Sequence, residues 1–333
     1  MFFKRRKADA TPPQPSTTAQ TKTGVPADYG QAAKQAVVRF YSAATLCGDR
    51  LGVEAEGYEA SLPPVRYLTP DIACGVAIDI GPSYQRVTQA DLDSWGVTLD
   101  QALTDAAARR MAEPLGIPVV GGLAMVRDET LGPALWIRPD VAAGIVKGTP
   151  VMVGLSRQLT LLASDGDPDW LEKMASYVLA ALNGDNWVES VTPTRWTGSG
   201  WESLTWEDVG VPRETDRAIA LRQDGRNYGR VRPVLKKWLE ARDEYPLTAA
   251  FQVFKTADGV EQSTVASVVN GDTEDNVIPR ADLVTFAFTD GRPTVRLTWE
   301  TVAAHCELTP LGLTPEWYAI GAIPDFDALD HSE

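Results

Sequence analysis

The sequence is poor in the residues that commonly carry nucleophilic and metal chemistry. It has only two histidines, His305 and His331, and three cysteines, Cys47, Cys74 and Cys306, among 333 residues. The cysteines are far apart and odd in number, which indicates free thiols rather than a disulfide framework and favours a cytoplasmic protein. No histidine or cysteine spacing fits a zinc site. We therefore predict no metal and no other cofactor.

Other motifs of common enzymes are missing as well. Hydrolase elbows, phosphate-binding glycine loops and dinucleotide fingerprints are absent. A catalytic triad would depend on His305, and a histidine late in a short helix more often interacts with the helix dipole. Paired carboxylates stay open as a catalytic device, because an acidic chain offers many such pairs. An enzyme is therefore the less favoured class.

Long apolar runs are also lacking. No stretch approaches the roughly 20 apolar residues that a membrane span needs, so we predict no integral membrane segment. Residues 1–7 are basic, but no apolar run follows them as it would in a secretory signal. The segment 8–27 is rich in Pro, Ser, Thr and Gln, and we predict a flexible, basic-tipped tail over 1–27.

Charge is distributed unevenly along the chain. The whole chain carries −14, whereas residues 1–27 carry +4, so the remainder carries −18. A body this acidic repels phosphate backbones and makes nucleic acid an unfavourable partner. Another protein is the expected partner. The basic cluster at residues 4–7, next to Phe2 and Phe3, leaves a weak peripheral membrane contact as an alternative.

Hydrophobic periodicity and turn signals predict an α+β fold of two domains, with mixed, largely antiparallel short-strand sheets and packed helices. The domains are expected at 28–207 and 208–328, with a flexible end at 329–333. The predicted helices cover 28–46, a segment following Thr98, 139–146, a segment opening at Pro168, 231–242 and a segment following Thr298. The predicted strands include 75–80, 84–87, 117–126, 134–137, 151–155 and 159–163, and hairpins are expected at 196–201, 249–269 and 283–297.

Two groups of residues are candidates for partner binding. Trp187, Trp196, Trp201 and Trp206 surround a turn at 197–200 and will either fill a core or serve as anchors for a partner. Arg226, Arg230 and Lys237 share one face only if a helix runs unbroken past Asp-Gly at 224–225 and Pro233, and those residues argue against it. A solvated face or an intramolecular partner is the first interpretation of these charges, and contact with an anion or a protein is the second.

The middle of the chain resembles the YtpQ-like family of cytosolic bacterial proteins of unknown function. The resemblance rests on Leu-Pro-Pro-Val at 62–65, on the run 76–87 (VAIDIGPSYQRV), on Asp91 and Leu92, on Trp-Gly-Val-Thr at 95–98 and on the run 157–163 (RQLTLLA). It covers about residues 60–205. It implies a fold and a cytoplasmic location, and it implies no mechanism.

These observations favour a non-enzymatic cytoplasmic protein that acts by binding or regulating another protein. One alternative is a carboxylate-dependent hydrolase or transferase, which would need a deep pocket containing acidic residues with separated pKa values. The other alternative is a membrane-surface adaptor that uses the basic N-terminal tip.

Overall fold

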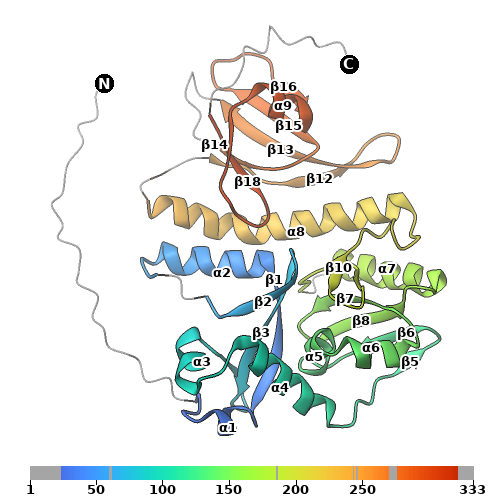
Figure 1. Ribbon diagram of the computed structural model, residues 1–333. Helices are drawn as coiled ribbons and strands as arrows, with labels where there is room; N and C mark the ends of the chain where they lie inside the picture. Colours follow the sequence, from blue (N-terminus) through green and yellow to red (C-terminus); the bar gives the residue numbers. More distant parts are fainter. Residues whose placement is uncertain are drawn as a thin grey trace, which may run out of the picture.

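The computed structural model describes residues 24–59, 62–184, 187–242, 244, 247–269 and 276–321 (Figure 1). Most of the predicted tail 1–27, including its basic tip, and the predicted flexible end 329–333 lie outside these residues. The fold is α+β, as predicted, with mostly antiparallel sheets. Among the described residues, no helix combines the length and apolar character needed to cross a membrane.

The first sheet contains four strands and carries the N-terminal part of the chain. Its order is β1-β3-β2, with β4 paired to β3, and all pairs are antiparallel. The helices α4 (Leu99–Met111) and α5 (Leu131–Ile137) pack on it, and Thr98 caps α4 as predicted by accepting the backbone N–H of Gln101. The strands are β1 (Ala36–Ser42), β2 (Val65–Thr69), β3 (Ile72–Asp79) and β4 (Tyr84–Arg86), and the neighbouring helices are α1 (Tyr29–Ala32), α3 (Gln89–Trp95) and α4 (Leu99–Met111).

The second sheet contains six strands in the order β10-β9-β7-β8-β6-β5. Its hairpin β9–β10 confirms the predicted tryptophan-bearing hairpin, in which Trp196 pairs with Trp201. The strands are β5 (Val119–Val120), β6 (Leu123–Val126), β7 (Pro150–Ser156), β8 (Leu159–Ser164), β9 (Thr194–Trp196) and β10 (Trp201–Ser203), and the helices are α5 (Leu131–Ile137), α6 (Pro139–Val146) and α7 (Pro168–Asn183).

The C-terminal part forms two further four-stranded sheets and a short helix. The orders are β11-β14-β18-β17 and β12-β13-β15-β16, and the hairpins predicted at 249–269 and 283–297 are confirmed. The elements are β11 (Leu247–Thr248), β12 (Gln252–Lys255), β13 (Glu261–Val269), β14 (Asn276–Pro279), β15 (Leu283–Phe288), β16 (Val295–Thr298), α9 (Trp299–His305), β17 (Leu308–Pro310) and β18 (Trp317–Ile320).

A long helix, α8 (Arg213–Glu240), lies between these C-terminal sheets and α2 (Ala43–Ala55) (Figure 1). Its buried Tyr228 and Leu235 form one apolar cluster with Leu51 of α2 and Trp317 of β18. The predicted domain boundary near residue 207 precedes this helix, and the division into two domains stays a prediction.

The single helix predicted over 28–46 is wrong, because β1 separates the short helix α1 from α2 within that segment. Every residue of β1 is buried, so its apolar residues Ala36, Val37, Phe40 and Tyr41 have the spacing of a helical apolar stripe although they lie on both faces of a strand. The strand predicted at 134–137 is also wrong. The carboxylate of Asp128 accepts the backbone N–H groups of Thr130 and Leu131 and stabilises the start of helix α5 there.

The predicted break before residue 231 is wrong as well, since α8 continues from Arg213 through Pro233 to Glu240. A proline in a helix interior removes one backbone hydrogen bond and costs about 3 kcal/mol. Burial of Val231, Leu235 and Leu239 on the same helix offsets that cost. Tertiary packing therefore decides the length of this helix.

We expect Gly154→Ala to destabilise the protein by about 1–3 kcal/mol, the usual cost of overpacking a core. A Cβ atom at Gly154 on β7 would lie 2.3 Å from the ring of Phe40 on β1, where the two N-terminal sheets meet. Gly48→Ala in α2 is the control, because a Cβ atom there meets no heavy atom within 4 Å. We expect it to stabilise by roughly 0.5–1 kcal/mol through helix propensity. Urea unfolding of both variants tests this, and a stable Gly154→Ala protein would contradict the close packing of the sheets.

Candidate functional site

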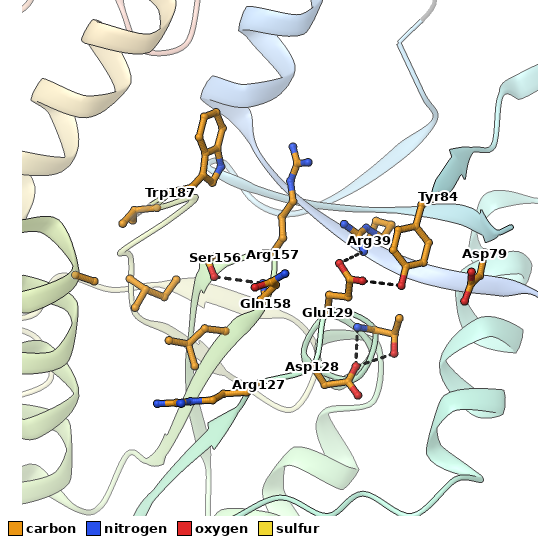
Figure 2. A pocket seen from close by; sticks show the side chains of 15 residues that line it. Arg39, Asp79, Tyr84, Arg127, Asp128, Glu129, Ser156, Arg157, Gln158 and Trp187 are labelled. Carbon is orange, nitrogen blue, oxygen red and sulfur yellow. Dashed lines mark hydrogen bonds and ion pairs between the residues drawn. The ribbon is translucent and has the colours of Figure 1, made fainter. Parts of the chain in front are cut away.

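A cleft of about 1230 Å³ opens where the first sheet faces the six-stranded sheet (Figure 2). Arg39 of β1 and Tyr84 of β4 lie on one side of it, and Arg157, in the turn between β7 and β8, and Trp187 lie on the other. The remaining lining residues are Asp79, Arg127, Asp128, Glu129, Thr130, Leu155, Ser156, Gln158, Leu159, Ala181 and Val188.

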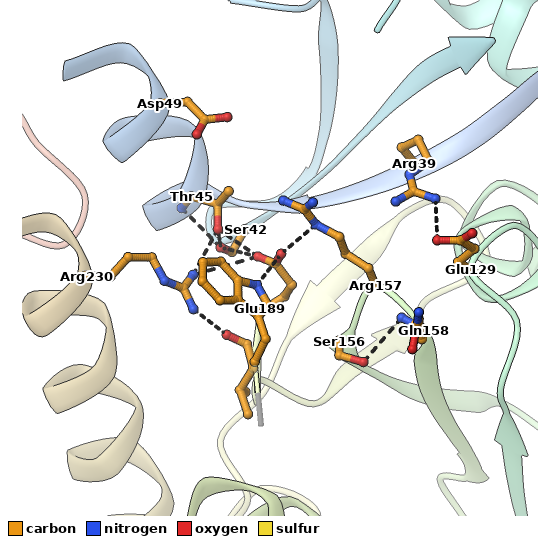
Figure 3. A network of polar contacts seen from close by, with 12 residues as sticks. Arg39, Ser42, Thr45, Asp49, Glu129, Ser156, Arg157, Gln158, Glu189 and Arg230 are labelled. Carbon is orange, nitrogen blue, oxygen red and sulfur yellow. Dashed lines mark hydrogen bonds and ion pairs between the residues drawn. The ribbon is translucent and has the colours of Figure 1, made fainter. Parts of the chain in front are cut away.

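The carboxylate of Glu189 lies behind this lining and has no exposed surface. One oxygen, Oε2, accepts hydrogen bonds from Ser42 Oγ at 3.0 Å and Thr45 Oγ1 at 2.7 Å. The other oxygen, Oε1, accepts from Trp187 Nε1 at 2.7 Å and Arg157 Nε at 3.1 Å. Ser42 and Thr45 lie at the start of α2, whereas Arg157 and Trp187 line the cleft. Figure 3 shows Ser42, Thr45 and Arg157 around Glu189.

Burial by itself would raise the pKa of Glu189. The hydrogen bonds from Thr45 and Trp187, together with the charges of Arg157 and Arg230, outweigh burial and hold the pKa below its usual value. Glu189 is therefore ionised in the folded protein and acts as a buried negative centre for the two arginines. It is not a proton donor.

Arg230 of α8 fixes the orientation of Trp187. Its Cζ atom lies 3.9 Å from the centroid of the indole ring, and its guanidinium donates to Thr45 Oγ1 at 2.9 Å and to the Val188 carbonyl at 2.8 Å. The nearest nitrogen of Arg230 lies 3.8 Å from Glu189 Oε2. Trp187 is thus held by its N–H and by one stacked cation, yet 53% of the residue is exposed.

Further arginines approach the cleft from the first sheet. Arg39 pairs with Glu129 at 3.0 Å and lies over the ring of Tyr84, whose hydroxyl donates to Glu129 at 2.7 Å. Burial raises the pKa of Tyr41, and the charges of Arg86, Arg39 and Arg157 oppose that shift, as expected of three guanidinium groups near one phenol. Figure 2 shows Arg157 between Trp187 and Arg39.

The arginines at this site are incompletely paired with carboxylates. Arg157 and Arg230 share the single carboxylate of Glu189. Arg127 is exposed and forms no hydrogen bond or ion pair with the described part of the chain. The cleft lining as a whole is balanced, with Arg39, Arg127 and Arg157 against Asp79, Asp128 and Glu129. Guanidinium groups that are not fully paired with carboxylates nevertheless face the cleft, although the chain as a whole carries −14.

The carboxylates that line the cleft are already engaged as acceptors. Asp79 accepts the backbone N–H of Gly81 at 2.8 Å, and Glu129 accepts from Arg39 and Tyr84. Burial opposes the ionisation of Asp128, but hydrogen bonds from Leu131, Arg110 and Thr130 hold its pKa far below the usual range. Within the described ranges, no group of three or more His, Cys, Asp or Glu side chains is arranged to hold a metal ion. The arrangement is suited to binding anions.

The four candidate tryptophans occupy different environments. Trp187 alone is largely exposed and lines the cleft. Trp196 and Trp201 are half-buried and contact each other at 5.4 Å between ring centroids, and Trp201 donates to the Trp136 carbonyl. Trp206 is 2% exposed and donates to the Val191 carbonyl, which leaves it no surface for a partner.

The basic candidates lie on one helix face, because α8 is continuous. Arg226 donates to the carbonyls of Leu182 and Gly184, and Arg230 donates to that of Val188, so both hold the segment that carries Trp187 and Glu189. Lys237 is exposed near the end of the helix. An intramolecular partner, the first interpretation of these charges, is present for Arg226 and Arg230.

Sequence reasoning missed Arg39, Arg157 and Glu189. A usable signal was present, because Arg39 interrupts the apolar run of β1 and Glu189 lies between Val188 and Val191 in a buried segment. A charged residue inside an apolar run has to find a partner when it is buried. The identity of that partner was not readable, since the donors to Glu189 span residues 42–187 and the nearby charge of Arg230 comes from α8.

Comparison of the chain with protein-family models, with curated proteins and with solved structures gives no match. The resemblance to the YtpQ-like family therefore stays a prediction.

We expect Glu189→Gln to lower the free energy of unfolding by about 3 kcal/mol, the lower end of the cost of removing one partner from a buried pair. The lower end applies because Arg157 is 41% exposed and water stabilises its charge. Glu202→Gln is the control, because Glu202 is an exposed partner of Arg195 and such pairs contribute at most about 1 kcal/mol. Chemical denaturation at pH 7 measures both, and equal losses would contradict the central position of Glu189.

The acid stability of the protein tests the ionisation of Glu189. Its pKa in the folded state lies below the usual value of 4.5, so the unfolded state binds more protons in this range. Stability should therefore be fully present above pH 4.5 and fall as the pH drops through the folded-state pKa. Glu189→Gln should show a shallower decrease, with a residual slope from Asp128, whose pKa is also lowered. Identical slopes for the two proteins would show that Glu189 is not ionised.

Proposed function

We propose that this chain is a binding protein without a chemical step of its own, and that its cleft holds an acidic segment of another protein. The observation that carries the proposal is the incomplete pairing of the arginines at the cleft. Arg157 and Arg230 share one carboxylate, and Arg127 has no partner among the described residues. Guanidinium groups bind carboxylates with two parallel hydrogen bonds, so a carboxylate side chain fits this surface well.

The dimensions of the cleft favour a peptide segment over a small molecule. Its volume of about 1230 Å³ exceeds the roughly 300–1,000 Å³ typical of small-ligand pockets. Arginine clusters are a recurrent means of recognising acidic motifs. Because Glu189 and Arg230 already hold Trp187 and Arg157 in place, little side-chain entropy is lost when a partner binds.

A cytoplasmic location forms part of this proposal. Cys47, Cys74 and Cys306 are buried and form no disulfide, which is usual in a reducing compartment. The membrane-adaptor alternative concerns residues 1–7, which lie outside the described residues.

Binding of a labelled acidic peptide tests the proposal. We expect a fluorescein-labelled peptide of alternating Glu and Gly to bind the full chain, and the same peptide with Gln in place of Glu to bind far more weakly. Arg127→Gln should weaken binding about tenfold, the effect of one charge-assisted hydrogen bond. The exposed side chain of Arg127 forms no hydrogen bond or ion pair with the described residues, so the substitution removes no such interaction.

Lys255→Gln is the matched control, because it removes one exposed positive charge from β12, on the other side of α8 from the cleft (Figure 1). Fluorescence anisotropy at two salt concentrations measures the dissociation constants. Equal effects of the two substitutions, or equal binding of the Glu and Gln peptides, would overturn the proposed function.

A further inference from the structure

A second, smaller cavity of about 420 Å³ adjoins the cleft between α2 and α8. Arg157 and Trp187 line both cavities, so together they form the wall between them. The other residues of this groove are Thr45, Gly48, Asp49, Gly52, Val53, Glu56, Arg230 and Val234. A ligand in the cleft can therefore reach the groove by passing over Trp187.

The groove exists because α2 presents two glycines to it. A Cβ atom at Gly48 would meet no heavy atom within 4 Å, and one at Gly52 would meet only Val234, at 3.5 Å. Glycine in a helix interior costs roughly 0.5–1 kcal/mol relative to alanine. Both glycines keep open a space that any larger side chain would narrow.

The groove accepts a different chemical group from the cleft. Its two acidic residues, Asp49 and Glu56, disfavour a second carboxylate, and Gly52, Val53 and Val234 give it apolar surface. Trp187 offers a fixed, half-exposed ring on which no other ring of the described residues stacks. Aromatic pairs are worth about 0.5–1.5 kcal/mol beyond the burial of their area.

We infer that the acidic partner segment carries an aromatic residue among its carboxylates, and that this ring packs on Trp187 and enters the groove between α2 and α8. The flanking carboxylates pair with Arg157 and Arg127 in the cleft. This inference rests on the proposed function and names the sequence class of the partner segment.

A set of labelled peptides separates the contribution of the aromatic ring to the affinity from the contribution of the carboxylates. The probes are labelled Glu-Glu-X-Glu-Glu peptides in which X is Phe, Leu or Ala, together with Gln-Gln-Phe-Gln-Gln, measured by anisotropy against the full chain. We expect the Phe peptide to bind about tenfold more tightly than the Ala peptide. The Leu peptide should lie between them, and the Gln peptide should bind most weakly.

Filling the groove tests where the ring binds. Gly48→Leu places a side chain in the open space on α2 and favours the helix. We expect it to lower the affinity for the Phe peptide to that for the Ala peptide and to leave the Ala peptide unchanged. Gly144→Leu in α6 is the matched control, because a Cβ atom there also meets no heavy atom within 4 Å and the residue lines neither cavity.

The outcomes separate the two proposals. If the Phe and Ala peptides bind equally while both exceed the Gln peptide, the inference is overturned and the proposed function stands. If the Gln peptide binds as tightly as the Phe peptide, the proposed function fails. A peptide of residues 324–330 (PDFDALD) has the inferred pattern within this chain, and its binding would support the inference.

Discussion

The structure around the cleft depends on the compensation of one buried charge. An ionised carboxylate without partners is costly to remove from water. At Glu189, hydroxyl, indole and guanidinium donors from the start of α2, the segment after α7 and the β7–β8 turn offset this cost, together with the charge of Arg230 on α8. Because these donors come from separate elements, the carboxylate fixes their positions relative to one another.

The same interaction gives the site its chemical character. Trp187 and Arg157 would have many rotamers on an open surface, and their bonds to Glu189 restrict them to the wall between the cleft and the groove. One carboxylate neutralises only one of the two guanidinium groups it holds. The terminal N–H groups of Arg157, which form no hydrogen bond with the described residues, are available to a partner, even though the chain as a whole is acidic. Net charge alone would have predicted repulsion of acidic segments at every surface.

The helix α8 connects this site to the rest of the molecule. Its buried residues pack on α2 and on β18, while Arg226 and Arg230 donate to carbonyl groups of the segment that leads to Trp187. A break at Pro233, which local propensity favours, would separate the packing residues Tyr228 and Val231 from Leu235 and Leu239. The apolar area that the continuous helix buries exceeds the local cost of the proline.

The sequence by itself determined the features that depend on neighbouring residues. These include the α+β class, the hairpins with glycine turns, the cap at Thr98 and the scarcity of histidine and cysteine. Tertiary structure decided the strand identity of β1, whose two buried faces erase the alternation that marks a strand in sequence. It also decided the candidate site, because Glu189 and its donors lie far apart along the chain. Only the pairing of sheets and the packing of α8 bring those donors to one carboxylate, and such long-range proximity leaves no local pattern to read.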